Sequence, residues 1–155
     1  MRLSKVIVLL GILLGLASSA LADTPVASDS GKVMPSAIGK FKLISKGLPP
    51  ENLDTGAAPT NVSRSDYVGP NDNKVSVERY EFRQDGQAYE MLSLISAAAR
   101  NSNSNVQIVN GIGTAGFATG DEIAFVKGVN FVRIRNLNGH SDLIEFARAW
   151  TEALD

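Results

Sequence analysis

The chain has 155 residues, no cysteine, one histidine and a formal net charge of −1. Without cysteine it can form neither a disulfide nor a thiolate metal site, and it lacks the residue on which bacterial lipoproteins are acylated. A single histidine excludes a multi-histidine metal centre. The balanced charge shows neither a nucleic-acid footprint nor a polybasic membrane patch. The composition therefore favours one domain held together by packing, with no nucleic-acid partner.

The first 22 residues have the pattern of a secretory signal peptide. Arg2 and Lys5 precede an apolar run over residues 6–16, and the small residues that follow end in Ala20-Leu21-Ala22. Because this run is far shorter than the roughly 20 residues that cross a bilayer, we expect no transmembrane anchor after signal cleavage. The sequence predicts cleavage between Ala22 and Asp23 and a secreted or periplasmic protein.

The remaining chain divides into a leader and one domain. Residues 23–37 hold too few apolar side chains to offset the entropy of ordering them, which predicts a flexible leader. The domain, residues 38–155, begins with a strand whose apolar residues alternate and which ends at the Gly-Leu-Pro-Pro stretch starting at Gly47. A second strand is expected at 62–68.

A hairpin is predicted next, because the turn-forming residues 69–73 separate the strand 62–68 from a second arm at 74–83. In that arm Val75 and Val77 lie on one face, whereas Tyr80 and Phe82 lie on the other. This change of phase predicts either a bulge or a strand that is covered on both faces.

The rest of the domain is predicted as helix, strands and helix. Apolar residues spaced by three and four indicate helices over residues 87–100, with Asp85 as a cap, and 142–154. Between the helices the pattern predicts strands at 106–112, 115–118, 123–127 and 131–136. The order predicts an α+β fold, in which an antiparallel sheet, made of a hairpin and then a meander, carries two amphipathic helices on one face.

Two short motifs invite a functional interpretation that their context does not support. Residues 111–116 match the dinucleotide fingerprint G-x-G-x-x-G, but a strand and a turn follow them instead of the helix that binds pyrophosphate. Glycine bends in a sheet are the favoured interpretation. His140-Ser141-Asp142 holds the residue types of a hydrolase triad, yet neighbours at a helix start cannot line up as one. Helix capping is favoured for them.

Arginines recur on two of the predicted strands. Arg79, Glu81 and Arg83 share one face of their strand, and Arg133 and Arg135 share the outward face of theirs. If these strands are neighbours, Arg79, Arg83, Arg133 and Arg135 form a patch that binds a carboxylate, a phosphate or an acidic partner. The alternative is a solvated face with cross-strand pairs of arginine and glutamate.

The segment Gly120–Ile134 pairs a G-D-x-x-x-F-x-K-G turn with a following F-V-x-I strand. In this it resembles uncharacterised secreted bacterial α+β domains, and the segment Tyr80–Ala99 is similar to the same group. The resemblance implies an α+β domain at the cell envelope, like extracellular sensor or lipoprotein domains that bind and do not catalyse. It implies no functional residues.

Two classes of function follow. The sequence pairs no nucleophile with a base and holds no metal cluster or cofactor loop, which favours a non-enzymatic module that binds an envelope protein or a small anionic ligand. The alternative is a small cell-envelope hydrolase with paired carboxylates, drawn from Asp121, Glu122, Glu78 and Glu81. Such carboxyl groups lie about 5 to 10 Å apart across a cleft. A buried acidic pair in a pocket would favour catalysis, and a flat or grooved face would favour binding.

Overall fold

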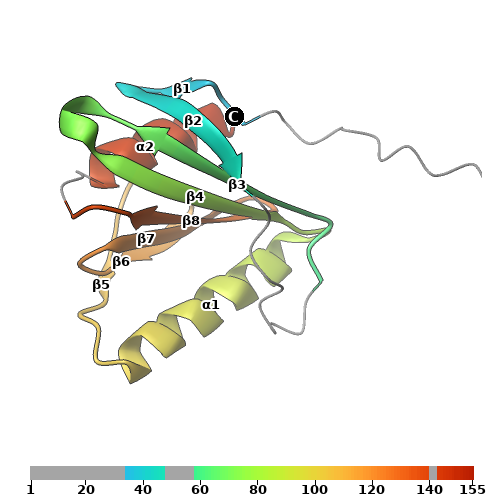
Figure 1. Ribbon diagram of the computed structural model, residues 1–155. Coiled ribbons are helices and arrows are strands. Elements are labelled where there is room, and N and C mark those ends of the chain that lie inside the picture. Colours follow the sequence, from blue (N-terminus) through green and yellow to red (C-terminus); the bar gives the residue numbers. More distant parts are fainter. Residues whose placement is uncertain (1–33, 48–57, 140–142) are drawn as a thin grey trace, which may run out of the picture. The chain divides into compact units, whose positions relative to one another are not determined.

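The computed structural model describes residues 34–47, 58–139 and 143–155 (Figure 1). These residues form eight strands, two α-helices and one 3-10 turn, Pro70–Asp72, between the third and fourth strands. The strands are β1 (Ala37–Ile38), β2 (Phe41–Gly47), β3 (Asn61–Val68), β4 (Lys74–Glu81), β5 (Gln107–Ile108), β6 (Ala115–Ala118), β7 (Glu122–Lys127) and β8 (Asn130–Asn136). The helices are α1 (Asp85–Asn101) and α2 (Leu143–Ala153).

Several predictions from the sequence concern residues outside the described part of the chain. They are the signal peptide, the cleavage site between Ala22 and Asp23, residues 23–33 of the leader and the motif His140-Ser141-Asp142. The last four residues of the predicted leader do belong to the packed domain. Met34 is buried in the core, and the hydroxyl group of Tyr67 donates a hydrogen bond of 3.0 Å to the carbonyl oxygen of Pro35.

The strands form one antiparallel sheet in the order β1-β2-β3-β4-β8-β7-β6-β5. The hairpin of β3 and β4 and the meander from β6 to β8 are both present, so the predicted α+β class and antiparallel sheet are confirmed. The last strand of the meander, β8, returns to pair with β4. This pairing joins the hairpin and the meander into one sheet.

The two helices cover opposite faces of this sheet, whereas the sequence analysis expected both on one face (Figure 1). On β7, Ile123 and Phe125 belong to the core cluster that holds α2, and Ala124 and Val126 belong to the cluster that holds α1. Successive side chains of a strand point to opposite faces. A strand that is apolar on both faces needs a cover on each, which places the helices on either side.

The same arrangement explains the change of phase in β4. All residues from Val75 to Tyr80 are buried, and the register with β3 and β8 runs without a shift. Val75 and Val77 pack with the α2 cluster, and Tyr80 packs with the α1 cluster. Of the two predicted explanations, a strand covered on both faces is the one found.

Aromatic contacts fix α2 on its face. Phe146 meets Phe41 and Tyr67 edge to face, with ring centroids 4.7 and 5.5 Å apart. Trp150, one turn further along α2, is 1% exposed. Each such aromatic pair contributes about 0.5–1.5 kcal/mol beyond the area it buries.

The strand predicted at 106–112 is shorter than expected, because only Gln107–Ile108 pair with β6. The chain then bends at Gly111 and Gly113, which have φ angles of +73° and +62°. The Gly113 amide donates a hydrogen bond of 3.2 Å to Thr151 Oγ1 of α2. A Cβ atom on Gly113 would lie 2.4 Å from the carbonyl oxygen of Val126. Two glycines of the G-x-G-x-x-G motif, Gly111 and Gly113, are thus backbone bends, and the third, Gly116, lies within β6.

Alanine substitutions of three glycines test this explanation. Gly113→Ala is expected to lower the free energy of unfolding by about 2–4 kcal/mol, since it combines a left-handed φ with a clash. Gly111→Ala has the φ penalty but open space around it, so a loss of about 1–2 kcal/mol is expected. Gly120→Ala has neither and serves as the control, within about 0.5 kcal/mol of the parent chain. Urea denaturation measures all three, and equal stability of the first and third would contradict the explanation.

Candidate functional site

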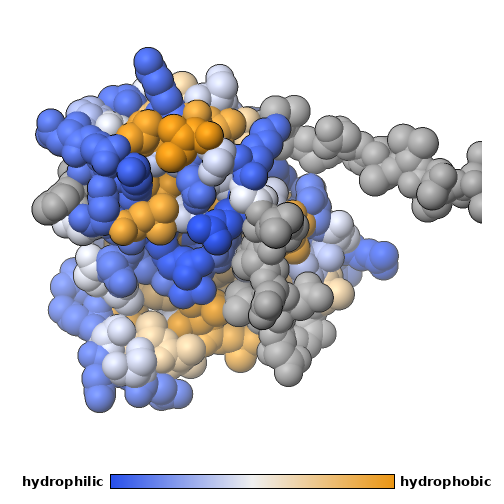
Figure 2. Space-filling model, viewed as in Figure 1, coloured by the Kyte–Doolittle hydropathy of each residue, from blue (hydrophilic) through white to orange (hydrophobic). Residues whose placement is uncertain are grey.

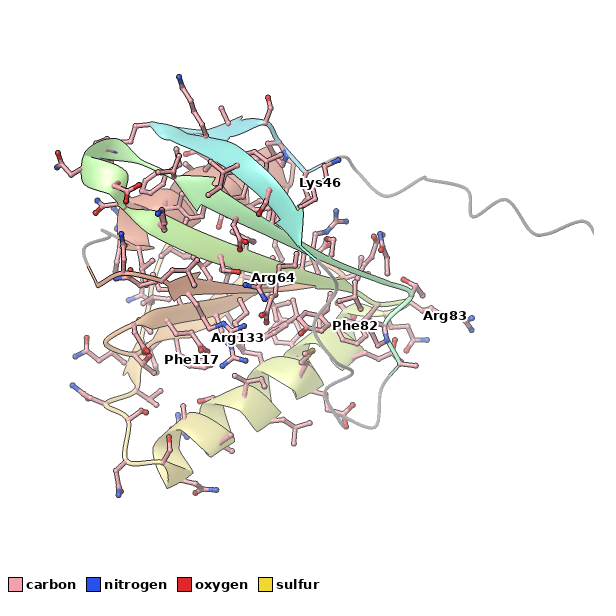
Figure 3. All side chains as sticks on the ribbon, viewed as in Figure 1. Lys46, Arg64, Phe82, Arg83, Phe117 and Arg133 are labelled. Atoms are coloured by element: carbon pink, nitrogen blue, oxygen red, sulfur yellow. The ribbon has the colours of Figure 1, made fainter. Side chains whose placement is uncertain are left out.

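The four arginines predicted to form an anion-binding patch do not come together, although β4 and β8 are neighbours. The register pairs Arg79 with Val132 and Glu78 with Arg133, so Arg79 lies on the opposite face from Arg133 and Arg135. Arg83 follows the end of β4 and is exposed. Figure 3 shows it beyond the end of the sheet, away from Arg133.

Arg79 is a buried structural residue, with 4% of its surface exposed. Its Nε donates a hydrogen bond of 2.8 Å to Asn130 Oδ1, and its guanidinium pairs with Glu81 at 3.0 Å. These contacts tie the end of β4 to the start of β8. The guanidinium is therefore already engaged within the fold.

Arg133 and Arg135 lie on the α1 face of the sheet, where charged side chains alternate in sign. Arg133 pairs with Glu122 at 2.6 Å, and Arg135 pairs with Glu78. Arg64 of β3 stands opposite Glu78 on the other side of β4. Figures 2 and 3 show hydrophilic side chains over the centre of the sheet, where Arg64 and Arg133 are labelled, and apolar ones where α1 packs.

This arrangement matches the alternative that the sequence left open, a face of cross-strand pairs of arginine and glutamate. The observed face differs from the expected solvated face in that its glutamates are buried, since Glu78 is 1% and Glu122 8% exposed. Burial raises the pKa of Tyr80, beside Glu78, and the charge of Glu78 raises it further. The phenol of Tyr80 therefore stays protonated, and its oxygen lies 3.5 Å from Glu78 Oε2.

The four carboxylates considered for a hydrolase are spread over the sheet. Glu78 and Glu122 share a face, but they are separated by β8 and offset by two residues in register, which puts their Cα atoms about 12 Å apart. Glu81 lies on the other face and pairs with Arg79. Asp121 is in an exposed turn, where Thr119 Oγ1 lies 3.1 Å from its carboxylate.

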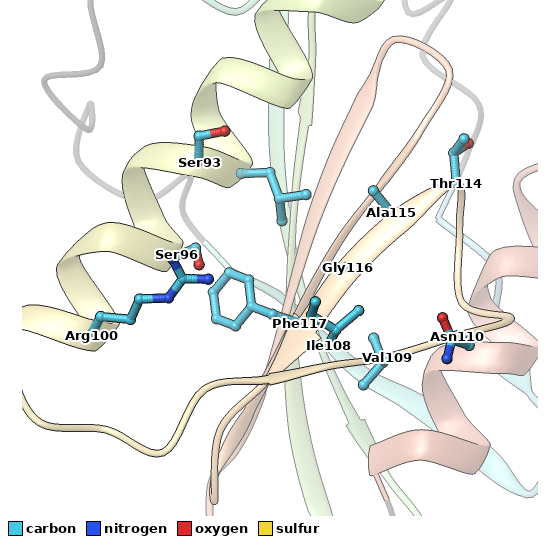
Figure 4. A pocket seen from close by; sticks show the side chains of 11 residues that line it. Ser93, Ser96, Arg100, Ile108, Val109, Asn110, Thr114, Ala115, Gly116 and Phe117 are labelled. Atoms are coloured by element: carbon cyan, nitrogen blue, oxygen red, sulfur yellow. The ribbon is translucent and has the colours of Figure 1, made fainter.

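A pocket of about 430 Å³ opens between the second half of α1 and the β5–β6 edge of the sheet. Its volume lies within the range of about 300–1,000 Å³ that is usual for ligand pockets. Figure 4 shows the side chains that line it. They come from α1 (Leu92, Ser93, Ser96, Arg100), from β5 and the bend after it (Ile108, Val109, Asn110), and from β6 with the residue before it (Thr114, Ala115, Gly116, Phe117).

Apolar and polar groups are separated within this pocket. Phe117 is buried and forms part of the apolar α1 cluster, while Ile108 is 79% exposed at the outer side. The hydroxyl groups of Ser93 and Ser96 come from one side of α1. The pocket thus has an apolar floor, hydroxyl groups along α1 and the exposed side chain of Ile108 at its outer side, which suits a ligand with an apolar body.

Arg100 supplies the charge of the pocket. It lies in the last turn of α1, where Asn103 adopts a left-handed φ of +58° and the Ser104 amide donates to the carbonyl oxygen of Ala99. This ending stops the helix at Asn101, one residue after Arg100, and fixes the turn that carries Arg100. Within the described residues its guanidinium has no ion pair or hydrogen bond. In Figure 4 it extends toward Phe117.

The sequence interpretation missed Arg100 because it followed arginines on strands. Arg100 stands at the end of an amphipathic helix, where a basic residue is ordinary because it complements the helix dipole. Only the position of β5 and β6 beside α1 makes it part of a pocket. No motif in the sequence marks that juxtaposition.

Comparisons with known proteins add no family to this picture: no family model, no curated protein and no solved structure matches the chain. Neither described helix is long and apolar enough to span a membrane. In the described residues no group of three or more histidine, aspartate or glutamate side chains is arranged to hold a metal ion.

The charged face predicts a measurable contribution to stability. Glu78→Gln is expected to lower the free energy of unfolding by about 2 kcal/mol. This is less than for a fully buried pair, because the Arg135 side chain is 40% exposed and regains water. The control is Asp72→Asn, which breaks an exposed pair with Lys74 and should change stability by at most about 0.5 kcal/mol. If thermal unfolding shows the same loss of stability for both variants, the burial of Glu78 does not increase the contribution of its ion pair to stability.

Proposed function

We propose that the protein is a secreted or periplasmic, non-enzymatic binding module, whose pocket between α1 and the β5–β6 edge takes a ligand with an apolar body and an anionic group. The observation that carries this proposal is an apolar floor in one pocket of about 430 Å³ with the guanidinium of Arg100, which has no ion pair or hydrogen bond among the described residues. The signal-like pattern of residues 1–22 supports the location.

The pocket is a better candidate for anion binding than Arg133 and Arg135. Each of those guanidiniums already pairs with a glutamate, whose negative charge opposes the approach of a second anion. Arg100 has no such partner among the described residues. The ligand's anionic group gains a charge-assisted hydrogen bond, and its apolar part is removed from water against Phe117.

Calorimetry with 4-phenylbutyrate and its neutral amide tests the proposal. A charge-assisted hydrogen bond contributes about 1.5–3 kcal/mol, so the carboxylate should bind about tenfold or more tightly than the amide. Arg100→Gln should abolish this preference. Arg148→Gln, which removes an exposed arginine from α2, should leave it unchanged. Equal affinity for acid and amide, or no saturable binding of either at about 10 mM, would refute the proposal.

A second pair of variants tests where the ligand sits. Ser96 lines the pocket, whereas the adjacent Ala97 is exposed and does not. Ser96→Phe should fill the pocket and reduce binding of 4-phenylbutyrate by about tenfold or more, while Ala97→Phe should have little effect. Because both positions lie on α1, Ala97→Phe reveals any effect that an added phenyl ring has on this helix without filling the pocket. Loss of binding in both variants, or in neither, would place the ligand elsewhere.

A further inference from the structure

The edge strand beside the pocket defines the ligand more closely. We infer, building on the proposed function, that the pocket binds the C-terminal end of an extended peptide. The peptide adds as a further strand to the outer edge of β5, its last side chain enters the pocket, and its terminal carboxylate meets Arg100. Four features of the described residues lead to this inference.

The first is the free hydrogen-bonding edge of β5. In the antiparallel ladder with β6, the Val109 amide donates to the carbonyl oxygen of Gly116 at 3.2 Å, and Ile108 stands opposite Phe117. Hydrogen-bonded and non-hydrogen-bonded pairs alternate in such a ladder. Ile108 therefore belongs to a non-hydrogen-bonded pair, and its N–H and C=O groups point away from β6. They are available to an added strand.

The second is that this edge carries neither charged side chains nor proline to oppose pairing. Sheet edges are commonly guarded by charged side chains or proline, and residues 101–110 contain neither. At the other edge of the sheet, Ile38 of β1 is buried beside α2, and Lys40 next to it pairs with Glu145 at 2.8 Å. Ile108 is instead 79% exposed. The edge without a charged or proline guard is the one next to the pocket.

The third is the direction of the side chains. Ile108 and Phe117 share the sheet face that lies beneath α1, and both line the pocket. A strand added beside β5 sends every second side chain to this same face, about 5 Å from Ile108. Such a side chain enters the open side of the pocket, where it buries the exposed surface of Ile108.

The fourth is that one part of the ligand must supply both the anionic group for Arg100 and the apolar side chain for the pocket. Since β5 is only two residues long, an added strand can pair with it over a short stretch only. Arg100 and the apolar floor lie in the same pocket. The last residue of a chain offers an apolar side chain and a carboxylate together. A second copy of this protein pairing through its own β5 does not, since residues 101–110 contain no aspartate or glutamate to meet Arg100.

The test compares three forms of the peptide acetyl-Ser-Thr-Val-Phe. The first has a free carboxyl end, the second is its C-terminal amide, and the third has a free carboxyl end and methylated backbone nitrogens. The free acid should bind at least tenfold more tightly than either of the others. It should also slow hydrogen exchange of the Ile108 amide. Arg100→Gln should remove the difference between acid and amide. Methylated and unmethylated peptides of equal affinity would overturn strand addition.

Two variants of one residue separate backbone pairing from side-chain contact. Ile108→Pro removes the outward N–H without removing a bond to β6, because proline is tolerated where an edge amide faces solvent. It should weaken binding of the peptide at least tenfold more than Ile108→Ala does. The two variants, which both lose the isoleucine side chain, should bind 4-phenylbutyrate with equal affinity. If Ile108→Pro does not fold, the methylated peptide decides the question.

The outcomes distinguish this inference from the proposed function. Binding of 4-phenylbutyrate at Arg100 without tighter, methylation-sensitive binding of the peptide would leave the proposed function in place and reject the peptide end. Failure of both ligands would reject both. Analytical ultracentrifugation of the free protein tests whether a second copy of the chain pairs with the β5 edge. A dimer that dissociates in the Ile108→Pro variant would show such pairing and would overturn the inference.

Discussion

Strand β7 is apolar on both of its faces, and the rest of the structure follows from the need to cover both. Ile123 and Phe125 face α2, and Ala124 and Val126 face α1. A sheet buried on both faces is common with helical crossovers between parallel strands, but here every strand pair is antiparallel. One helix on each side is the cover that this chain supplies, because its apolar pattern holds two amphipathic helices.

Helix α1 packs over part of its face, and two other regions of that face differ in chemistry. Over β3, β4 and β8 the α1 face carries Arg64, Glu78 and Arg133 in adjacent positions, and their charges are balanced inside the fold. Near β5 and β6 the same helix leaves a pocket with an apolar floor, and its arginine, Arg100, makes no ion pair among the described residues. The first region stabilises the sheet. The second is the region that we propose as the ligand site.

Local patterns in the sequence were sufficient for the class of fold and for most elements, because periodicity of two or of three to four residues reports which side chains are buried. The hairpin around residues 69–73 and both helices are found where this periodicity predicts them. The side of the sheet on which each helix lies was not predictable in this way. The side depends on the pairing of β4 with β8, which are separated by about fifty residues of chain. In addition, Ile-Ala-Phe-Val along β7 is one continuous apolar run, which does not show which residues face which helix. The pocket was missed for the same reason, since Arg100 and Phe117 meet only in three dimensions.

The most direct test of the central claim is a map of amide chemical-shift changes in the nitrogen-15-labelled protein during titration with 4-phenylbutyrate. The account predicts saturable changes in the last two turns of α1 and in residues 108–117, around Arg100 and Phe117. It predicts no such changes at Arg133 and Arg135, whose guanidiniums bond Glu122 and Glu78. Changes centred on Arg64, Arg133 and Arg135 would contradict the account and return the binding site to the charged face of the sheet.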